Sequence, residues 1–397
     1  MTLHPADRLA FDKAMVTQPV WNRFNTACDA VNLDENILLH AGPAFSNPSK
    51  ITLPILNSAC VAAVFEGLAK NFDEAEAMIL ASEIILKPSQ DHDVVTPLAA
   101  VVSASMPLHT VYDAWGGQQR VYAPINAGSR PAMRLGLRSE AVLEHIRWLN
   151  TRFLDVLEDG LAEGIALVPL AVIGLAGGDD CHGRTPVAHA ALVNELKDRT
   201  LHAITDENVL QFMATSPSLF LNLWMAATKC MMKLAEGVEG SSFITAAGGN
   251  GREIGIQISG LPGQWFTVAA SAPKGKFDVD LPEDRSLGAI GDSAVVEAFG
   301  LGAMVIELSP EQKKLLSAYL PEDAAVRSSR LSVGAHPNFR NHTIKLGSTA
   351  RGAVGAGAGP VIGLGILDRL GKAGRLGGGI YDMPVDPFFA AISALKK

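Results

Sequence analysis

The apolar segment from Leu219 to Leu234 constrains the fold of this chain more than any other part of its sequence. Its apolar residues surround a helix on all sides instead of forming one stripe, which predicts a helix buried in a protein core. Ser216 is a good N-cap and Pro217 suits the first helical position, so we expect the helix to begin there.

Two polar residues interrupt this apolar segment. Asn222 and Lys229 are two helical turns apart and are expected on one face of the helix. A buried lysine must find a partner or lose its proton, because an unpaired charge is costly in an apolar core. Asn222 and Lys229 are therefore candidate substrate-binding residues, with a structural hydrogen-bond network as the alternative.

Beyond Gly237 the apolar pattern changes to the period of two that is typical of strands. Strands are predicted at 242–245, 253–258 and 264–268, and Asn250-Gly251 is the strongest short hairpin signal. Asp292 then precedes a predicted helix of small residues, from Ala294 to about Val305. Asn250, Gly251 and Asp292 lie at junctions of this meander, where binding sites tend to be built, so they are further substrate-binding candidates. A plain hairpin turn and a helix N-cap are the competing interpretations.

The whole chain of 397 residues is long enough for two or three domains. The patterns predict a multidomain α+β protein with a mixed α/β part at 1–135, a mainly helical part at 136–236 and an α+β part with an antiparallel meander at 237–397. The last part includes the segment 347–379, in which twelve of the 33 residues are glycine. Such a segment indicates either a ligand loop or a structural loop with close backbone approach.

The composition of the chain excludes several classes of binding partner. A net charge of −8 argues against nucleic acid or an anionic membrane as a partner. The apolar runs are shorter than the ~18 residues that a membrane helix needs. The four cysteines form no CxxC pair, and no nucleotide-binding glycine motif is present, so neither a metal nor a cofactor is expected. We expect a cytoplasmic protein, and a mean hydropathy of +0.20 favours assembly into an oligomer.

The most concentrated polar cluster is the loop from Gly178 to Arg184. It precedes a predicted helix that begins at Thr185-Pro186, where backbone N–H groups favour an anion. His182 is the candidate for proton transfer, oriented by Asp179 or Asp180, and Arg184 is the candidate for holding a carboxylate or phosphate. The alternative is that the aspartates cap helices and pair with Arg184.

Several motifs, in order along almost the whole chain, resemble the YlbE-like proteins of bacteria. They are Leu39-His-Ala-Gly-Pro43, the loop 178–184, Phe220 to Lys229, Gly249 to Gly255, Ser259-Gly-Leu261, Trp265-Phe266 and Gly291-Asp-Ser-Ala-Val-Val-Glu297. The family includes one subunit of oxamate carbamoyltransferase, which interconverts oxamate and carbamoyl phosphate with carbamoyl-oxamate beside an acyl-CoA-synthetase-like subunit and a third protein. The chain departs from the family pattern at 89–100, 125–128 and 365–379.

The resemblance implies a subunit of a carbamoyl- or acyl-group transferase that acts on a small amide or carboxylate in allantoin nitrogen catabolism. It also implies a carbamoyl phosphate-like ligand, and either a homo-oligomer or a complex with the acyl-CoA-synthetase-like subunit. Arg184, Asn222, Lys229 and Asn250 are expected to meet at one solvent-reachable hollow. The alternative is a non-catalytic scaffolding or ligand-binding subunit; a stand-alone amide hydrolase is a minor candidate.

Overall fold

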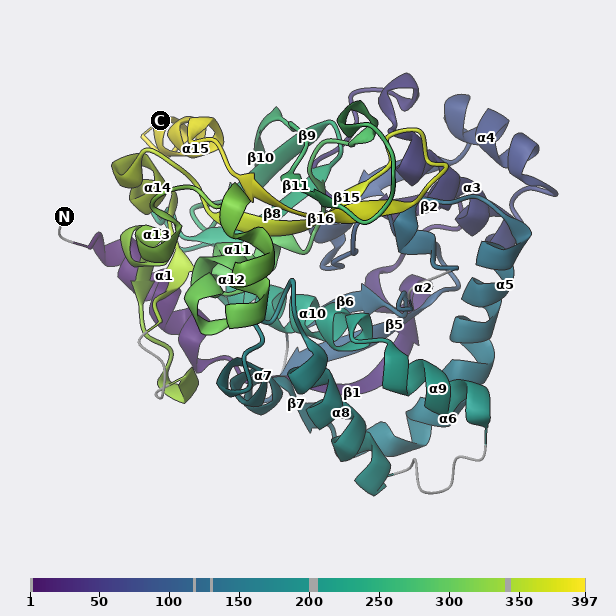
Figure 1. The fold of residues 1–397 in the computed structure, drawn as a ribbon, viewed down its shortest axis with the longest axis horizontal. Helices are drawn as coiled ribbons and strands as arrows, with labels where there is room; N and C mark the ends of the chain where they lie inside the picture. Colours follow the sequence, from purple (N-terminus) through teal and green to yellow (C-terminus); the bar gives the residue numbers. More distant parts are fainter. Residues whose placement is uncertain (1–2, 117–118, 129–130, 200–205, 340–343, 397) are drawn as a thin grey trace.

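A computed structural model of the protein describes residues 3–116, 119–128, 131–199, 206–339 and 344–396. It is an α+β fold, as predicted: helices surround several small sheets, of which all but one are wholly antiparallel. Figure 1 shows both ends of the chain on the same side of the molecule.

Helix α10 (Ser218–Leu234) lies in the middle of the molecule, and its residues from Leu219 to Met232 are buried apart from Leu221 (Figure 1). It packs against strands of the N-terminal sheet on one side and against β8 and α11 on the other. The predicted buried helix is therefore confirmed. Its N-cap is Pro217 instead of Ser216, whose backbone carbonyl accepts from the Leu219 N–H.

The N-terminal sheet has the antiparallel strand order β6-β5-β1-β7. Its strands are β1 (Pro19–Thr26), β5 (Pro107–Asp113), β6 (Arg120–Pro124) and β7 (Ile165–Ala166). A second sheet pairs β2 (Ile37–His40) in parallel with β3 (Ile85–Pro88) and antiparallel with β4 (Val101–Val102). The helices of this part are α1 (Pro5–Val16), α2 (Ala27–Val31), α3 (Leu53–Glu66) and α4 (Phe72–Leu80).

The middle of the chain is mainly helical. Its helices are α5 (Glu140–Trp148), α6 (Leu154–Glu158), α7 (Leu167–Ala176), α8 (Pro186–Arg199) and α9 (Glu207–Thr215). The main hydrophobic core contains residues from all three predicted parts of the chain, and β7 of the middle part pairs with β1. The division into domains at 135 and 236 stays a prediction.

The predicted meander is present in the C-terminal part, where the strand order is β10-β9-β8-β12. Its strands are β8 (Ile244–Asn250), β9 (Glu253–Ile258), β10 (Leu261–Ala269) and β12 (Ile290–Gly291). A second antiparallel sheet has the order β11-β16-β15, and β13 pairs with β14. These strands are β11 (Lys274–Phe277), β13 (Ser332–Gly334), β14 (Leu346–Ser348), β15 (Val361–Leu367) and β16 (Arg375–Asp382).

Five helices complete this part: α11 (Ala294–Phe299), α12 (Pro310–Leu316), α13 (Ala324–Leu331), α14 (Ala350–Ala356) and α15 (Asp386–Ala394). The predicted helix from Ala294 to Val305 ends at Phe299, because Gly300 is left-handed with φ 114°. A 3-10 segment then runs from Gly302 to Leu308 and contacts β15 and α13. This early end matters for the site, because it frees an N–H group at Ala303.

Candidate functional site

A small hollow of about 190 Å³ lies between α10, the polar loop at 178–184 and the glycine-rich strands β15 and β16. We call it the His182 cavity. Its lining residues come from segments that are far apart in the sequence: Pro97, Leu98, Arg134, His182, Gly183, Ser218, Leu221, Asn222, Ser293, Gln312, Gly363, Leu364, Gly365, Arg375, Gly378 and Gly379. The glycines of β15 and β16 therefore form part of its wall. Close backbone approach is confirmed at Gly377, where an added Cβ would meet the backbone of β11, whereas a ligand loop in the segment 347–379 stays a prediction.

A histidine–glutamate pair stands at this cavity. The Nδ1 atom of His182 lies 2.6 Å from Oε1 and 2.8 Å from Oε2 of Glu297, which is fully buried on α11. The Glu297 Oε1 atom also accepts from the backbone N–H groups of Ala303 and Gly363, both at 3.1 Å. A carboxylate only accepts, so the pair makes Nδ1 the donor and leaves Nε2 free for a ligand.

The pair sets the charge of His182. Burial lowers the pKa of His182, but the charge and hydrogen bond of Glu297, with a smaller contribution from Asp180, outweigh burial and raise that pKa above its ordinary 6.5. The surroundings therefore favour the cationic form of the imidazole more than water does. Such a group can give a proton to a bound molecule or attract an anion.

Asp180 fixes the backbone of the loop that carries His182. Its buried carboxylate accepts from the backbone N–H groups of His182 and Arg184 at 2.8 and 2.9 Å, which fixes the turn between them. Burial raises the pKa of Asp180 to about 6, although the two backbone hydrogen bonds favour its charged form. Asp180 thus positions the loop and does not itself line the cavity.

Two arginines add positive charge. Arg134 donates to the Gly128 carbonyl at 2.5 Å, and no carboxylate pairs with it within the described part of the chain. Burial and the neighbouring Arg375 lower the pKa of Arg134 to about 10, so it remains charged at neutral pH. Arg375 is exposed and pairs with Asp278 at 2.6 Å. Arg134 is therefore the cation of this cavity with the least counter-charge, and guanidinium groups suit planar anions.

Helix α10 contributes the predicted Asn222 to the cavity. Its Nδ2 donates to the Pro124 carbonyl at 3.2 Å, whereas its buried Oδ1 has no partner among the residues that the structure describes. One turn earlier, the Ser218 hydroxyl accepts from the Gly128 N–H at 3.3 Å. The start of α10 is thus tied to the loop that precedes Arg134.

The other half of the predicted site lies elsewhere. Lys229 is buried, and its Nζ donates to Glu236 at 3.0 Å and to the Thr245 carbonyl at 2.9 Å. Arg184 does not line the cavity; its side chain is 39% exposed and points to Asp179 at 3.9 Å. The structure therefore does not bring Arg184, Lys229 and Asn250 around one hollow, because the two buried residues satisfy neighbouring parts of the fold.

Asn250, Gly251 and Asp292 belong to a buried structural network. Asn250 donates to the Pro43 carbonyl and accepts from the N–H groups of residues 252 and 253, and Gly251 is the left-handed residue of the hairpin with φ 84°. The Asp292 carboxylate is fully buried and accepts from the backbone at Gly42 and Thr96 and from the side chains of Ser89, Gln90 and Thr96. These groups hold loops together one layer behind Ser293, which does line the cavity.

Sequence reasoning missed Glu297, Arg134 and Arg375. Glu297 is the one charged residue in the apolar run 294–306, and a carboxylate in such a run needs a partner. That signal was present in the sequence. Arg134 and Arg375 carried no comparable signal, because their surroundings depend on chain segments that are distant in sequence.

Comparison with known proteins identifies the family. The profile of the family described as "Oxamate carbamoyltransferase subunit AllG" matches residues 84–293. The chain is 30% identical to "Uncharacterized protein YahG" of Escherichia coli K12 over 98% of its own length and 84% of the relative's. It belongs to the AllG family. The oxamate carbamoyltransferase subunit AllG of the same organism is 29% identical and covers 99% of this chain, which spans 97% of that relative.

The AllG fold is also seen in a solved structure. A conserved protein of unknown function from Enterococcus faecalis V583 superposes with a TM-score of 0.90 at 24% identity, over 98% of this chain and 97% of the other. At that identity the likeness concerns the fold alone. Within the described residues, no helix of this AllG-family chain is long and apolar enough to cross a membrane.

Two of the three stretches that are expected to depart from the family pattern line the His182 cavity, and the third contacts the lining residue Arg134. Pro97 and Leu98 come from the first, Gly128 of the second binds Arg134, and Gly365, Arg375, Gly378 and Gly379 come from the third. Residues 89–100, 125–128 and 365–379 are far apart in sequence, so only the fold makes them neighbours.

Proposed function

We propose that this chain is a subunit of a carbamoyl- or related acyl-group transferase and that the His182 cavity binds a small amide or carboxylate. The proposal rests on His182, which is held by the buried Glu297 and lines the same small hollow as Arg134. Membership of the AllG family supports it, since a relative is named as an oxamate carbamoyltransferase subunit. The proposed setting is the cytoplasm, in allantoin nitrogen catabolism beside an acyl-CoA-synthetase-like partner.

His182 has the proposed role of proton transfer. When phosphate attacks the carbamoyl carbon of carbamoyl-oxamate, the bond from that carbon to the oxamate nitrogen breaks and carbamoyl phosphate forms, and protonated His182 can give the departing nitrogen a proton from Nε2. In the reverse direction the oxamate nitrogen attacks the carbamoyl carbon, phosphate leaves, and the same Nε2 takes the proton from the nitrogen. Glu297 positions the imidazole and stabilises its cationic form, and Asp180 fixes the loop that carries it.

Arg134 has the proposed role of holding the anionic end of the substrate. A hollow of about 190 Å³ is smaller than the usual range of roughly 300–1,000 Å³ for ligand pockets, so it suits a molecule of only a few heavy atoms. Oxamate, which has one carboxylate and one amide, is of that size. Asn222 at the same wall has the proposed role of orienting the amide.

The binding step can be tested by titrating oxamate into the purified chain in a calorimeter. Arg134→Ala should weaken binding at least tenfold, because it removes the unpaired cation. Arg184→Ala is the matched control, since it removes a nearby arginine that does not line the cavity, and it should bind as the wild type does. Equal affinities for wild type and Arg134→Ala would refute the assignment of this cavity.

A second candidate function is a ligand-binding or scaffolding subunit whose partner carries the chemistry. Several apolar side chains favour a covering partner, among them Trp115 at 73% exposure and Phe389 at 50%. The two functions differ in the assembled complex. Loss of carbamoyl transfer in His182→Gln with oxamate affinity retained supports catalysis in this chain, whereas unchanged transfer supports the scaffolding function.

A further inference from the structure

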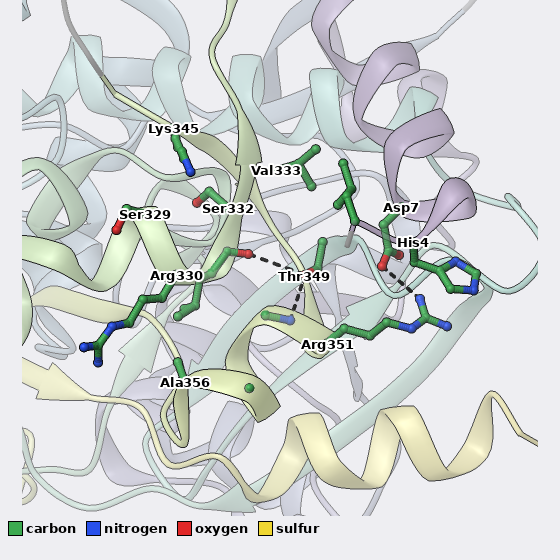
Figure 2. A pocket seen from close by; sticks show the side chains of 14 residues that line it. His4, Asp7, Ser329, Arg330, Ser332, Val333, Lys345, Thr349, Arg351 and Ala356 are labelled. Carbon is green, nitrogen blue, oxygen red and sulfur yellow. Dashed lines mark hydrogen bonds and ion pairs between the residues drawn. The ribbon is translucent and has the colours of Figure 1, made fainter. Parts of the chain in front are cut away.

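A larger hollow of about 680 Å³ lies at the side of the molecule where α1 meets α13, β13 and α14. We call it the α13–α14 pocket. It shares no lining residue with the His182 cavity. Its walls are formed by Leu3, His4, Asp7, Ser329, Arg330, Leu331, Ser332, Val333, Lys345, Thr349, Arg351, Gly352, Gly355 and Ala356 (Figure 2).

The charges of this pocket are unbalanced. Arg330, Lys345 and Arg351 supply three cations, and Asp7 is the one carboxylate among the lining residues. Asp7 is already committed: its Oδ2 pairs with Arg351 at 2.9 Å, and its carboxylate also accepts from Ser241 and Ser242. Arg351 and Asp7 therefore neutralise each other and hold the floor of the pocket (Figure 2).

The positive charges of Lys345 and Arg330 are balanced only weakly by neighbouring carboxylates. Within the described ranges no carboxylate pairs with Lys345, which is exposed and lines the pocket together with Ser332 (Figure 2). Arg330 lies 3.2 Å from Asp323, but Asp323 makes its shorter contacts to Arg327, at 2.6 and 3.0 Å. The pocket thus carries a surplus approaching two positive charges on side chains that a ligand can reach.

We propose that the α13–α14 pocket binds a small molecule that carries a phosphate group. A phosphate monoester bears about −1.5 to −2 charges at neutral pH, which matches the surplus. The volume lies within the roughly 300–1,000 Å³ range of small-molecule pockets, and four separate elements enclose it. A single carboxylate would leave one of the two cations without a counter-charge, so the balance favours the dianion.

Inorganic phosphate, titrated into the purified full-length chain in a calorimeter, is the probe. The wild type should bind it saturably at an ionic strength held constant with sodium chloride. The double variant Lys345→Ala, Arg330→Ala should lose at least tenfold in affinity. The control is Arg147→Ala, Lys197→Ala, which removes two exposed cations from α5 and α8 and should bind as the wild type does.

Each other outcome overturns the proposal. Non-saturable heat, or equal loss in the control variant, would mean that phosphate senses only the general charge of the surface. Binding of poly-glutamate but not of inorganic phosphate would assign the pocket to an acidic protein segment instead. Thermal unfolding without ligand should be the same for all three proteins, because Arg351 and Asp7 are left intact, and oxamate binding at the His182 cavity should be unaffected.

Discussion

Glu297 accepts the Nδ1 hydrogen bond of His182 at 2.6 Å, although 115 residues separate the two in sequence. Helix α11 ends two residues after Glu297, at Phe299, and the chain turns back through Gly300. This turn places the Ala303 N–H on the carboxylate that also accepts from His182. Glu297 is thereby held by two backbone donors and one imidazole. A group held in this way can tune the charge of its partner without being displaced.

Replacing Glu297 by Gln should lower the pKa of His182. Burial then acts on the imidazole without the opposing charge, so the pKa should fall below 6.5, whereas in the wild type it lies above 6.5. The rate of carbamoyl release from the oxamate nitrogen, which needs protonated His182, should decline as pH rises through the His182 pKa, and this decline should occur at lower pH in the variant.

The His182 pKa is measurable from its imidazole NMR signals across a pH series. Glu307→Gln, an exposed glutamate paired with Lys313, is the control and should leave the profile unchanged. Should Glu297→Gln not fold, the wild-type titration alone decides the matter: a wild-type His182 pKa below 6.5 contradicts the role given to Glu297.

Asp180 should make the free energy of unfolding depend on pH. Its folded pKa of about 6 exceeds the ordinary 3.8, so the folded state binds the proton more tightly than the unfolded state. Its contribution to stability is therefore greatest below about pH 4 and is lost as pH rises to about 6, at up to about 1.4 kcal/mol per pH unit. Asp180→Asn keeps an acceptor oxygen and should lack this dependence.

Urea denaturation of wild type and Asp180→Asn at several pH values gives the difference directly. The exposed Asp280→Asn serves for comparison and should follow the wild-type curve. Parallel curves for wild type and Asp180→Asn between pH 4 and 6 would show that the Asp180 carboxyl is not perturbed.

Asp292→Ala should destabilise the fold by at least about 3 kcal/mol. The substitution leaves the N–H groups of Gly42 and Thr96 and the polar side chains of Ser89 and Gln90 without their acceptor, and each buried unsatisfied donor costs about 1–3 kcal/mol. Chemical denaturation measures the loss, with Asp280→Asn again as the surface control. A loss of less than 1 kcal/mol would mean that these loops do not depend on Asp292.

Gly42→Ala should cost more stability than Gly67→Ala. Both glycines are left-handed, with φ 75° and 80°, so both substitutions carry the penalty of about 1–2 kcal/mol for an L-residue in this region. A Cβ at Gly42 would in addition lie 2.4 Å from the backbone carbon of Gly249, whereas nothing lies within 4 Å of a Cβ at Gly67. Equal losses in thermal or urea unfolding would argue against the close approach at Gly42.

Local patterns were enough to predict the helices and strands that depend on nearby residues. The buried α10 and the hairpin at Asn250-Gly251 both follow from residue spacing and turn chemistry. The end of α11 was placed wrongly, because Gly300 was not recognised as a left-handed stop within an apolar run. The resemblance over the whole chain pointed to the family that the comparisons then established.

The sequence by itself determined which residues must be buried and which polar side chains among them need partners, because burial of a polar group requires a hydrogen bond wherever it occurs. Only the tertiary structure decided which residues are the hydrogen-bond or ion-pair partners of these side chains. Lys229 and Asp292 are satisfied within the fold, whereas His182 pairs with the buried Glu297 and lines a cavity together with Arg134. The physical reason is that pairing depends on distances between segments that are remote in sequence. The packing of α10 between the N-terminal sheet and β8 sets these distances, and no local sequence pattern encodes them.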